Sequence, residues 1–231
     1  MEYNKSSIET LFAPLLFQDD YYAAVEKPAG LFVHPMPGEK DSQDCLLFRL
    51  RDQLGTYLYP VNRLDRPVSG IVLFAKKPEW VTLIQERWQK PETRKHYLCL
   101  NRGKLESSGQ FNRPLSKRGA FKKKGPPQDA LTLYDPIKYF PEYFCTYTKV
   151  EIKTGRYHQI RRHFRQAVMP LIGDRTHGKG VVNNFFLEEF GLKQVFLHAT
   201  RLEFIHPVTG QPIKVISTLP SVLTGILNKL R

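Results

Sequence analysis

Cysteine is scarce in this sequence, and long apolar runs are absent from it. Cys45, Cys99 and Cys145 are the only cysteines among 231 residues, and no two of them form a C-x-x-C pair. The sequence therefore predicts neither a zinc site nor a disulfide framework, but small buried side chains in a reducing compartment. There is no stretch of 18 apolar residues, and the N-terminus lacks the basic and apolar regions of a signal peptide. We expect a cytoplasmic protein with no membrane partner.

The usual motifs for nucleotide binding and metal hydrolysis are also missing. Residues 173–179 match G-x-x-x-x-G-K, but Gly180 stands where a Ser or Thr must hold magnesium. His158 and His163 are five residues apart, so they do not share a helix face as the two His of H-E-x-x-H do. A Ser/His/Asp triad stays open on spacing alone, although no G-x-S-x-G turn occurs. No metal is therefore expected.

Positive charge is what the sequence has in excess. There are 35 Lys and Arg against 22 Asp and Glu, so the formal net charge is +13 and the pI is near 9.7. Between residues 94 and 125 there are 10 Lys or Arg, and Glu106 is the only acidic residue. We expect this segment to be a solvated loop that contacts phosphates, with a generally basic surface as the plain alternative. The charge favours nucleic acid over anionic membrane as a partner.

Short strand patterns alternate with a few helical patterns along the chain. Apolar runs bounded by turn residues predict strands at residues 15–17, 22–25, 57–61, 71–75, 97–100, 131–139, 144–152 and 195–204. Helical spacing predicts helices at 42–55 (with Ser42 as N-cap), from Pro78, at 155–168, at 183–190 and after Pro220. This order predicts an α+β fold with a mainly antiparallel mixed sheet flanked by helices and loops. We expect a single domain at 13–231 after a loose arm at 1–12.

One loop carboxylate is the best candidate for chemistry. Asp65 lies between Arg63 and Arg66 on a tight connection between two predicted strands. A structural role is the plain reading, because loop carboxylates are commonly solvated or cap their own turn. An Asp can instead serve as a covalent nucleophile if it stays ionised in a dry pocket, and a neighbouring cation promotes that ionisation. Arg161, on the predicted helix at 155–168, is the foremost candidate for that cation.

Three blocks of sequence together carry a family resemblance. They are residues 27–35 (KPAGLFVHP), 62–70 (NRLDRPVSG) and 155–174 (GRYHQIRRHFRQAVMPLIGD). In order and spacing they resemble the RluA-type pseudouridine synthases, from about residue 15 to residue 214. The R-L-D and G-R-x-H-Q-I-R patterns are specific in combination and weak separately. Finer features, such as the G-D-x-T-H-G loop at 173–178, resemble a branch of that family that modifies tRNA.

The resemblance implies roles for individual residues. Asp65 would be the nucleophile that allows uracil to leave its ribose nitrogen bond, turn and reattach through carbon. Arg161 would pair with Asp65 and keep it anionic, and Tyr97 would stack on the flipped uracil and assist proton removal at its ring carbon. Arg63 would enter the space that the base vacates. The pocket wall would come from Leu171 and Ile172, and RNA contacts from Lys122, Lys123, Lys124, Arg162 and Arg165.

The resemblance also implies a substrate. We expect a monomeric catalytic domain, without the N-terminal RNA-binding domain frequent in the family, that isomerises a T-stem uridine of tRNA. No cofactor is expected, because the isomerisation is redox-neutral. The same reaction on ribosomal RNA or on another tRNA uridine is an alternative, since the family's substrates diverge while its site does not. Asn62 and Val68 replace the family's usual His and Thr, which leaves a non-catalytic RNA-binding protein as a distant alternative. We expect these two changes to alter loop hydrogen bonds only.

Overall fold

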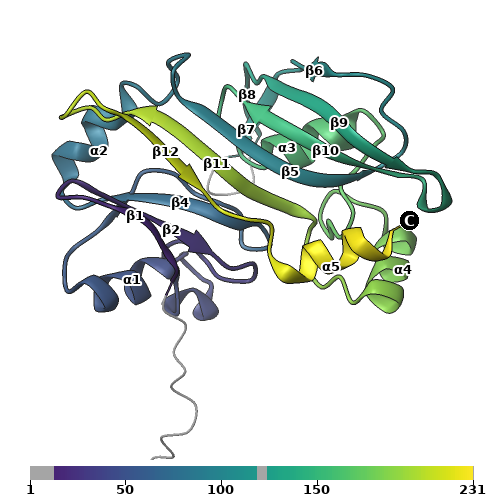
Figure 1. The fold of residues 1–231 in the computed structure, drawn as a ribbon, viewed down its shortest axis with the longest axis horizontal. Helices are drawn as coiled ribbons and strands as arrows, with labels where there is room; N and C mark the ends of the chain where they lie inside the picture. The colour runs from purple at the N-terminus through teal and green to yellow at the C-terminus, as the bar shows by residue number, and fades with distance from the viewer. Residues whose placement is uncertain (1–12, 119–123, 231) are drawn as a thin grey trace, which may run out of the picture.

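The structure is a computed structural model that describes residues 13–118 and 124–230, and this part contains twelve strands and five α-helices (Figure 1). The predicted arm at 1–12 lies outside the described residues. The strands are β1 (Leu15–Gln18), β2 (Tyr22–Lys27), β3 (Tyr59–Pro60), β4 (Ser69–Ala75), β5 (Arg94–Arg102), β6 (Gly109–Phe111), β7 (Leu115–Arg118), β8 (Lys124–Gln128), β9 (Thr132–Phe140), β10 (Cys145–Ile152), β11 (Leu197–Ile205) and β12 (Pro212–Ile216). The helices are α1 (Leu46–Leu54), α2 (Pro78–Gln85), α3 (Gln159–Gln166), α4 (Gly180–Phe190) and α5 (Ser221–Lys229), with 3₁₀ turns at Lys40–Gln43 and Pro141–Tyr143.

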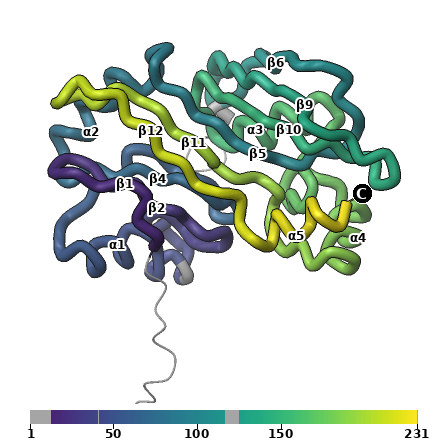
Figure 2. Tube along the Cα trace, viewed as in Figure 1, coloured from purple at the N-terminus to yellow at the C-terminus, as the bar shows by residue number. Residues whose placement is uncertain are grey.

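Ten of these strands form one large sheet. Its order is β1-β2-β4-β11-β5-β10-β9-β6, with β3 beside β4 and β12 beside β11, while β7 and β8 form a separate ribbon. Among the described strands, β4 and β11 are the only parallel pair. The trace in Figure 2 shows β4, β11 and β5 running together through the middle of the molecule. The predicted α+β fold with a mainly antiparallel mixed sheet is therefore confirmed.

The helices cover the sheet through separate apolar clusters. The largest cluster joins β2, β4, β5 and β10 to Leu50 of α1 and Phe164 of α3. A second packs Ile84 of α2 against β2, β4, β11 and β12, and a third includes residues of α4 and α5. The three cysteines are buried and unpaired, as expected. No helix in the described ranges is long and apolar enough to cross a bilayer.

The basic segment at 94–125 is not the loop that its composition suggests. It contains β5, β6, β7 and the start of β8, so the loop prediction is wrong for those residues, while Lys122 and Lys123 lie outside the described residues. Composition misleads here because pairing with β10 and β11 decides that β5 is a strand, and because edge ribbons such as β7–β8 tolerate Lys and Arg well. Six of the ten basic residues of the segment lie on described strands: Arg94, Lys95, Arg102, Lys117, Arg118 and Lys124.

Two smaller predictions also need correction. The helix predicted at 42–55 begins only at Leu46, and Cys45 is its N-cap residue. Ser42 instead lies in the preceding 3₁₀ turn, where its Oγ accepts the backbone N–H of Met36 at 2.7 Å. The strand predicted at 57–61 is only the two-residue β3, and β12 was not predicted at all. Both β3 and β12 pair at the margins of longer strands, where tertiary pairing outweighs local pattern.

Candidate active site

Asp65 lies on the loop between β3 and β4, and this loop is held from two sides. On one side, the side-chain oxygen of Asn62 accepts the backbone N–H of Leu73 in β4 at 2.7 Å. On the other side, the backbone N–H of Gly30 donates to the carbonyl of Arg66 at 2.7 Å. Asn62, which stands where the family usually has His, thus links the loop to β4. The loop presents Asp65 from a fixed backbone.

Close contact between strands brings this loop next to β5. Gly70 of β4 is paired with Ala199 of β11, which in turn is paired with Tyr97 of β5. Gly70 has φ of 117°, and a Cβ at this position would lie 2.3 Å from the carbonyl oxygen of Ala199. Only glycine permits this backbone conformation and this approach. The register therefore sets Tyr97 in line with the strand that begins directly after the Asp65 loop.

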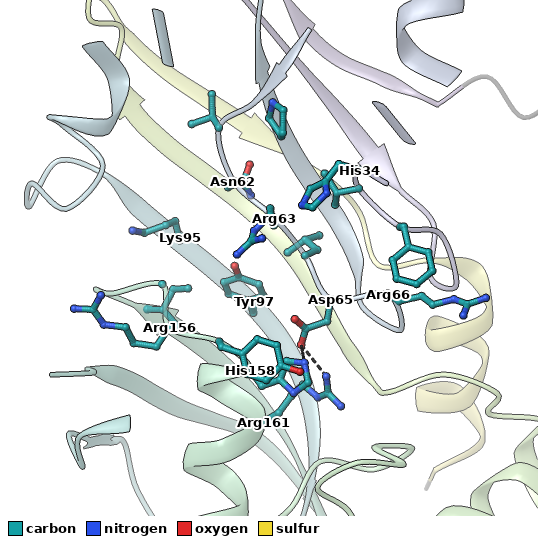
Figure 3. A pocket seen from close by; sticks show the side chains of 18 of the residues that line it. His34, Asn62, Arg63, Asp65, Arg66, Lys95, Tyr97, Arg156, His158 and Arg161 are labelled. Atoms are coloured by element: carbon teal, nitrogen blue, oxygen red, sulfur yellow. Dashed lines mark hydrogen bonds and ion pairs between the residues drawn. The ribbon is translucent and has the colours of Figure 1, made fainter. Parts of the chain in front are cut away.

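Arg161, in the first turn of α3, contacts two carboxylates at once. Its Nη1 donates to Oδ2 of Asp65 at 2.8 Å. Its Nε and Nη2 donate to the two oxygens of Asp174 at 2.8 and 2.7 Å. The Arg161 side chain is 3% exposed, so the guanidinium is desolvated and needs a carboxylate partner. The structure thus brings Asp65 and Arg161 together across 96 residues of sequence (Figure 3).

Asp174 is a member of the site to which the sequence reasoning assigned no role. Its side chain is 0% exposed, and its Oδ1 also accepts the backbone N–H groups of Thr176 and His177 at 2.9 and 3.0 Å. Gly173 before it has φ of 79° and lies too close to the carbonyl of Gln194 for any side chain. The available signal was a carboxylate after Gly and an apolar run, within a block that carries the family resemblance.

The two carboxylates have opposite pKa shifts. Burial raises the pKa of Asp65 above its usual range, and the hydrogen bond and charge of Arg161 offset part of that rise. Burial acts on Asp174 in the same direction, but its paired contact with Arg161 outweighs this and lowers the pKa of Asp174. Arg161 therefore promotes ionisation of Asp65, as expected, without restoring an ordinary carboxyl pKa.

A cleft of about 590 Å³ opens in front of this pair. Asp65, Tyr97, Arg63 and Arg161 all line it, so four predicted site residues meet there. Asp65 is the only carboxylate among the lining residues, against five Lys and Arg side chains. Burial raises the pKa of Tyr97, with a further contribution from the Asp65 charge, so its phenol is neutral near pH 7. Such a cleft suits a planar uncharged ring with anionic groups around it.

His158 lies near Asp65, although no role in the site was predicted for it from the sequence. Its Nε2 is 3.6 Å from Oδ2 of Asp65, and its Nδ1 is 3.0 Å from Nε2 of His177. It precedes α3 with φ of 51°, and its ring stacks on Tyr157 at 3.7 Å. His158 therefore belongs to the lining of the cleft. The available signal was its place in the G-R-x-H-Q-I-R pattern that carries the family resemblance.

The other predicted site residues that the structure describes are not among the residues that line the cleft. The structure places Leu171 and Ile172 in apolar clusters behind the site, both 1% exposed, and not in the cleft lining. Arg162 donates to the carbonyl of Ser116 in β7 at 3.1 Å, and Arg165 to that of His177 at 3.3 Å. The other predicted RNA contacts are Lys122 and Lys123, which lie outside the described residues, and Lys124, which begins β8.

Metal binding has no support within the described ranges, where no group of three or more His, Cys, Asp or Glu side chains could hold an ion. The site is an ion-paired carboxylate beside a buried phenol, at the base of a cationic cleft. It can supply an oxygen nucleophile and a surface for an aromatic ring.

Solved structures with this fold are pseudouridine synthases. Human RNA pseudouridylate synthase domain containing 4 superposes with a TM-score of 0.73 at 22% identity, over 94% of this chain and 92% of that chain. Human RNA pseudouridylate synthase domain containing 1 gives 0.72 at 18% identity, over 91% of this chain and 86% of that chain. At these identities the similarity defines the fold.

Sequence comparison identifies the family. The family model for RNA pseudouridylate synthase matches residues 21–166. The tRNA pseudouridine synthase C of Vibrio cholerae is 34% identical over 93% of this chain and 94% of its own length, and that of Pasteurella multocida is 33% identical over 93% and 94%. The chain belongs to the RNA pseudouridylate synthase family, within the RluA-type group that its sequence blocks resemble. It is an RNA pseudouridine synthase, an isomerase that converts uridine in RNA into pseudouridine.

Proposed function

We propose that this enzyme isomerises a T-stem uridine of tRNA, with Asp65 as the nucleophile. The observation that carries the catalytic assignment is the contact of 2.8 Å between Arg161 and Asp65 in a cleft with no other carboxylate. The tRNA assignment is supported by relatives named tRNA pseudouridine synthase C, which align over 93% of the chain. The enzyme acts as a single catalytic domain and requires no cofactor, because no net oxidation or reduction takes place.

Each residue has a defined part in the proposed reaction. The Asp65 carboxylate bonds to the target nucleotide, at ribose C1′ or at the uracil ring, and the bond between C1′ and uracil N1 breaks. The ring turns and C5 bonds to C1′, the bond to Asp65 breaks and restores the free carboxylate, the proton on C5 is lost, and N1 takes up a proton. Arg161 promotes ionisation of Asp65 and holds its orientation. Tyr97 supports the uracil face, and its neutral phenol suits stacking better than proton removal.

The flipped uridine leaves a gap in the RNA that Arg63 is placed to fill. Arg63 lines the cleft and is exposed at its mouth, two residues from Asp65 (Figure 3). Inserting a guanidinium into the vacated stack offsets part of the few kcal/mol typical of unstacking. The wider RNA contact would come from Arg165, from Arg162 beside the β7–β8 ribbon, and from Lys122, Lys123 and Lys124. Clustered Lys and Arg side chains suit contact with phosphates.

The test is position-resolved pseudouridine mapping. Unmodified tRNA and ribosomal RNA transcripts are incubated with wild-type protein and with Asp65→Asn, without added cofactor. We expect product at one T-stem uridine of tRNA with the wild type and none with the variant. Asp52→Asn, an exposed carboxylate on α1, is the matched control and should retain full activity.

The other outcomes are distinct. Product in ribosomal RNA alone would overturn the tRNA assignment and keep the family reaction. Product at the same uridine with Asp65→Asn would overturn the nucleophile. Tight tRNA binding with no product from the wild type would favour a binding role.

A further inference from the structure

Two buried lysine ammonium groups near the site have very different surroundings. Lys27 is 0% exposed, and its Nζ donates to the carbonyls of Pro28, Leu31 and Arg66 at 2.8, 2.8 and 3.2 Å. An ammonium has three N–H donors, so all of them are used by the protein. Lys27 is not among the residues that line the cleft. Its partners account for it as a structural link between two loops.

Lys95 is almost as buried, with 7% of its surface exposed, but it is not satisfied in this way. Within the described part of the chain its Nζ makes one hydrogen bond, to the carbonyl of Trp88 at 2.9 Å, and no ion pair. The Trp88 ring lies beside it, 5.3 Å from Nζ to the ring centroid. Burial lowers the pKa of Lys95 to about 8, the charge of Lys153 lowers it further and the charge of Glu151 partly offsets this, so the group is mostly protonated at neutral pH. Glu151 is not in ion-pair contact with Lys95, and a buried cation without an anion in contact is costly unless a ligand supplies one.

The position of Lys95 indicates which ligand this is. Lys95 precedes Tyr97 by two residues on β5, so both side chains lie on the same face, with Cα atoms about 7 Å apart. Both line the same cleft, and Figure 3 shows Lys95 on the far side of Tyr97 from Asp65. Arg156 is a second cation lining this cleft. The unpaired ammonium is therefore about one nucleotide step from the place proposed for the uracil.

We infer that Lys95 binds the backbone phosphate of a nucleotide adjacent to the target uridine. The ligand is thus an RNA phosphodiester, and the cleft holds the target and part of its neighbour at once. A fixed phosphate contact next to the flipped base would define the register of the strand in the cleft. The inference rests on the proposed placement of the target uridine at Asp65.

The experiment couples a charge in the protein to a charge in the RNA. A T-arm RNA hairpin is made with a neutral methylphosphonate at each of the two linkages on either side of the target, one at a time. Equilibrium binding is measured for wild type, Lys95→Met and Lys95→Gln. Gln retains an N–H donor for the Trp88 carbonyl, whereas Met retains the side-chain length. Lys149→Met removes an exposed lysine from the opposite face of the same sheet and is the control.

We expect one linkage to weaken wild-type binding about tenfold, as a lost charged hydrogen bond does. Lys95→Met and Lys95→Gln should bind the unmodified hairpin about tenfold more weakly and be indifferent to that linkage. For both variants, the slope of log binding constant against log salt concentration should be less steep than that of the wild type by a little less than one. Lys149→Met should respond to that linkage like the wild type.

Wild-type binding that is indifferent to all four linkages would overturn the inference without any variant. So would an unchanged response to the same linkage in both Lys95 variants. Binding and product formation are measured separately, so failure of the Lys95 inference can be distinguished from failure of the proposed function. Product at the T-stem uridine without coupling would overturn the role of Lys95 alone, and coupling without product would overturn the proposed reaction alone.

Discussion

The loop that carries Asp65 and the loop that carries Asp174 place a carboxylate against the same guanidinium, yet the two groups behave differently. Asp174 is 0% exposed and accepts two hydrogen bonds from Arg161 and two from backbone N–H groups. Asp65 is 25% exposed, accepts one hydrogen bond from Arg161 and faces the cleft. The pKa of Asp174 is lowered, whereas that of Asp65 is raised by its burial.

This difference shows how one arginine can serve two purposes. Asp174 accepts from two of the three guanidinium nitrogens and fixes the direction of the group, because paired charged hydrogen bonds are strong and geometrically demanding. Asp65 accepts from the third nitrogen and faces the cleft. A carboxylate that is only partly satisfied remains available for reaction, whereas a fully satisfied one is an anchor.

Replacing Asp65 should have the largest effect on rate and a small effect on folding. We expect Asp65→Asn to lower single-turnover product formation by at least about 10⁴-fold, as loss of a nucleophile does. The free energy of unfolding in urea should stay within about 1 kcal/mol, because the amide oxygen can still accept from Arg161 and no buried charge is added. A large loss of stability would show that Asp65, too, is an anchor.

Replacing Asp174 should reverse this balance. Asp174→Asn leaves Arg161 buried with half of its ionic partners, and breaking a buried ion pair costs about 3–5 kcal/mol. We expect the midpoint of urea unfolding to fall accordingly at pH 7. Activity should also decrease, because Arg161 would no longer be held in contact with Asp65. Equal stability of the Asp65→Asn and Asp174→Asn variants would contradict the distinction between anchor and nucleophile.

The two carboxylates should also respond differently to pH. The pKa of Asp65 is raised, and a nucleophile must be ionised. The acid limb of the pH profile of kcat/KM should therefore have an apparent pKa above 3.8, and kcat/KM should fall about tenfold per pH unit below that pKa. The pKa of Asp174 is lowered, so its contribution to stability is present above its unfolded value and is lost as the pH falls through its folded value. A pH–rate profile and acid unfolding measure the two separately. An acid limb at or below the ordinary carboxyl pKa would contradict the first expectation.

The smallest effect should come from the support of the Asp65 loop. Asn62→Ala removes the acceptor for the backbone N–H of Leu73 and should lower the free energy of unfolding by about 1–2 kcal/mol. Product formation should stay within about tenfold, because Gly30 still holds the other side of the loop. Loss of all product with normal stability would place Asn62 in the chemistry.

Much of this site could be predicted from sequence blocks. Asp65 and Arg161 lie in blocks whose order and spacing indicate the family, the resemblance implies a role for Tyr97, and the structure brings all three to one cleft. The Asp174 anchor was missed because a carboxylate after glycine is common, and nothing local shows which guanidinium it meets. Leu171 and Ile172 were placed in the pocket wall because the family resemblance implies it, but both are buried in apolar clusters and do not line the cleft.

The sequence by itself determined the family, the alternation of strands and helices, and the residue types of the site. Those properties depend on local periodicity and on side-chain chemistry, and both can be read directly from the amino-acid sequence. Only the tertiary structure decided which buried charged groups have their hydrogen-bonding capacity filled by the protein. Lys27 and Lys95 are both buried lysines, yet one meets three carbonyl oxygens and the other meets one. The same holds for Asp65 and Asp174, because hydrogen bonding depends on strand register and on contacts between residues far apart in sequence.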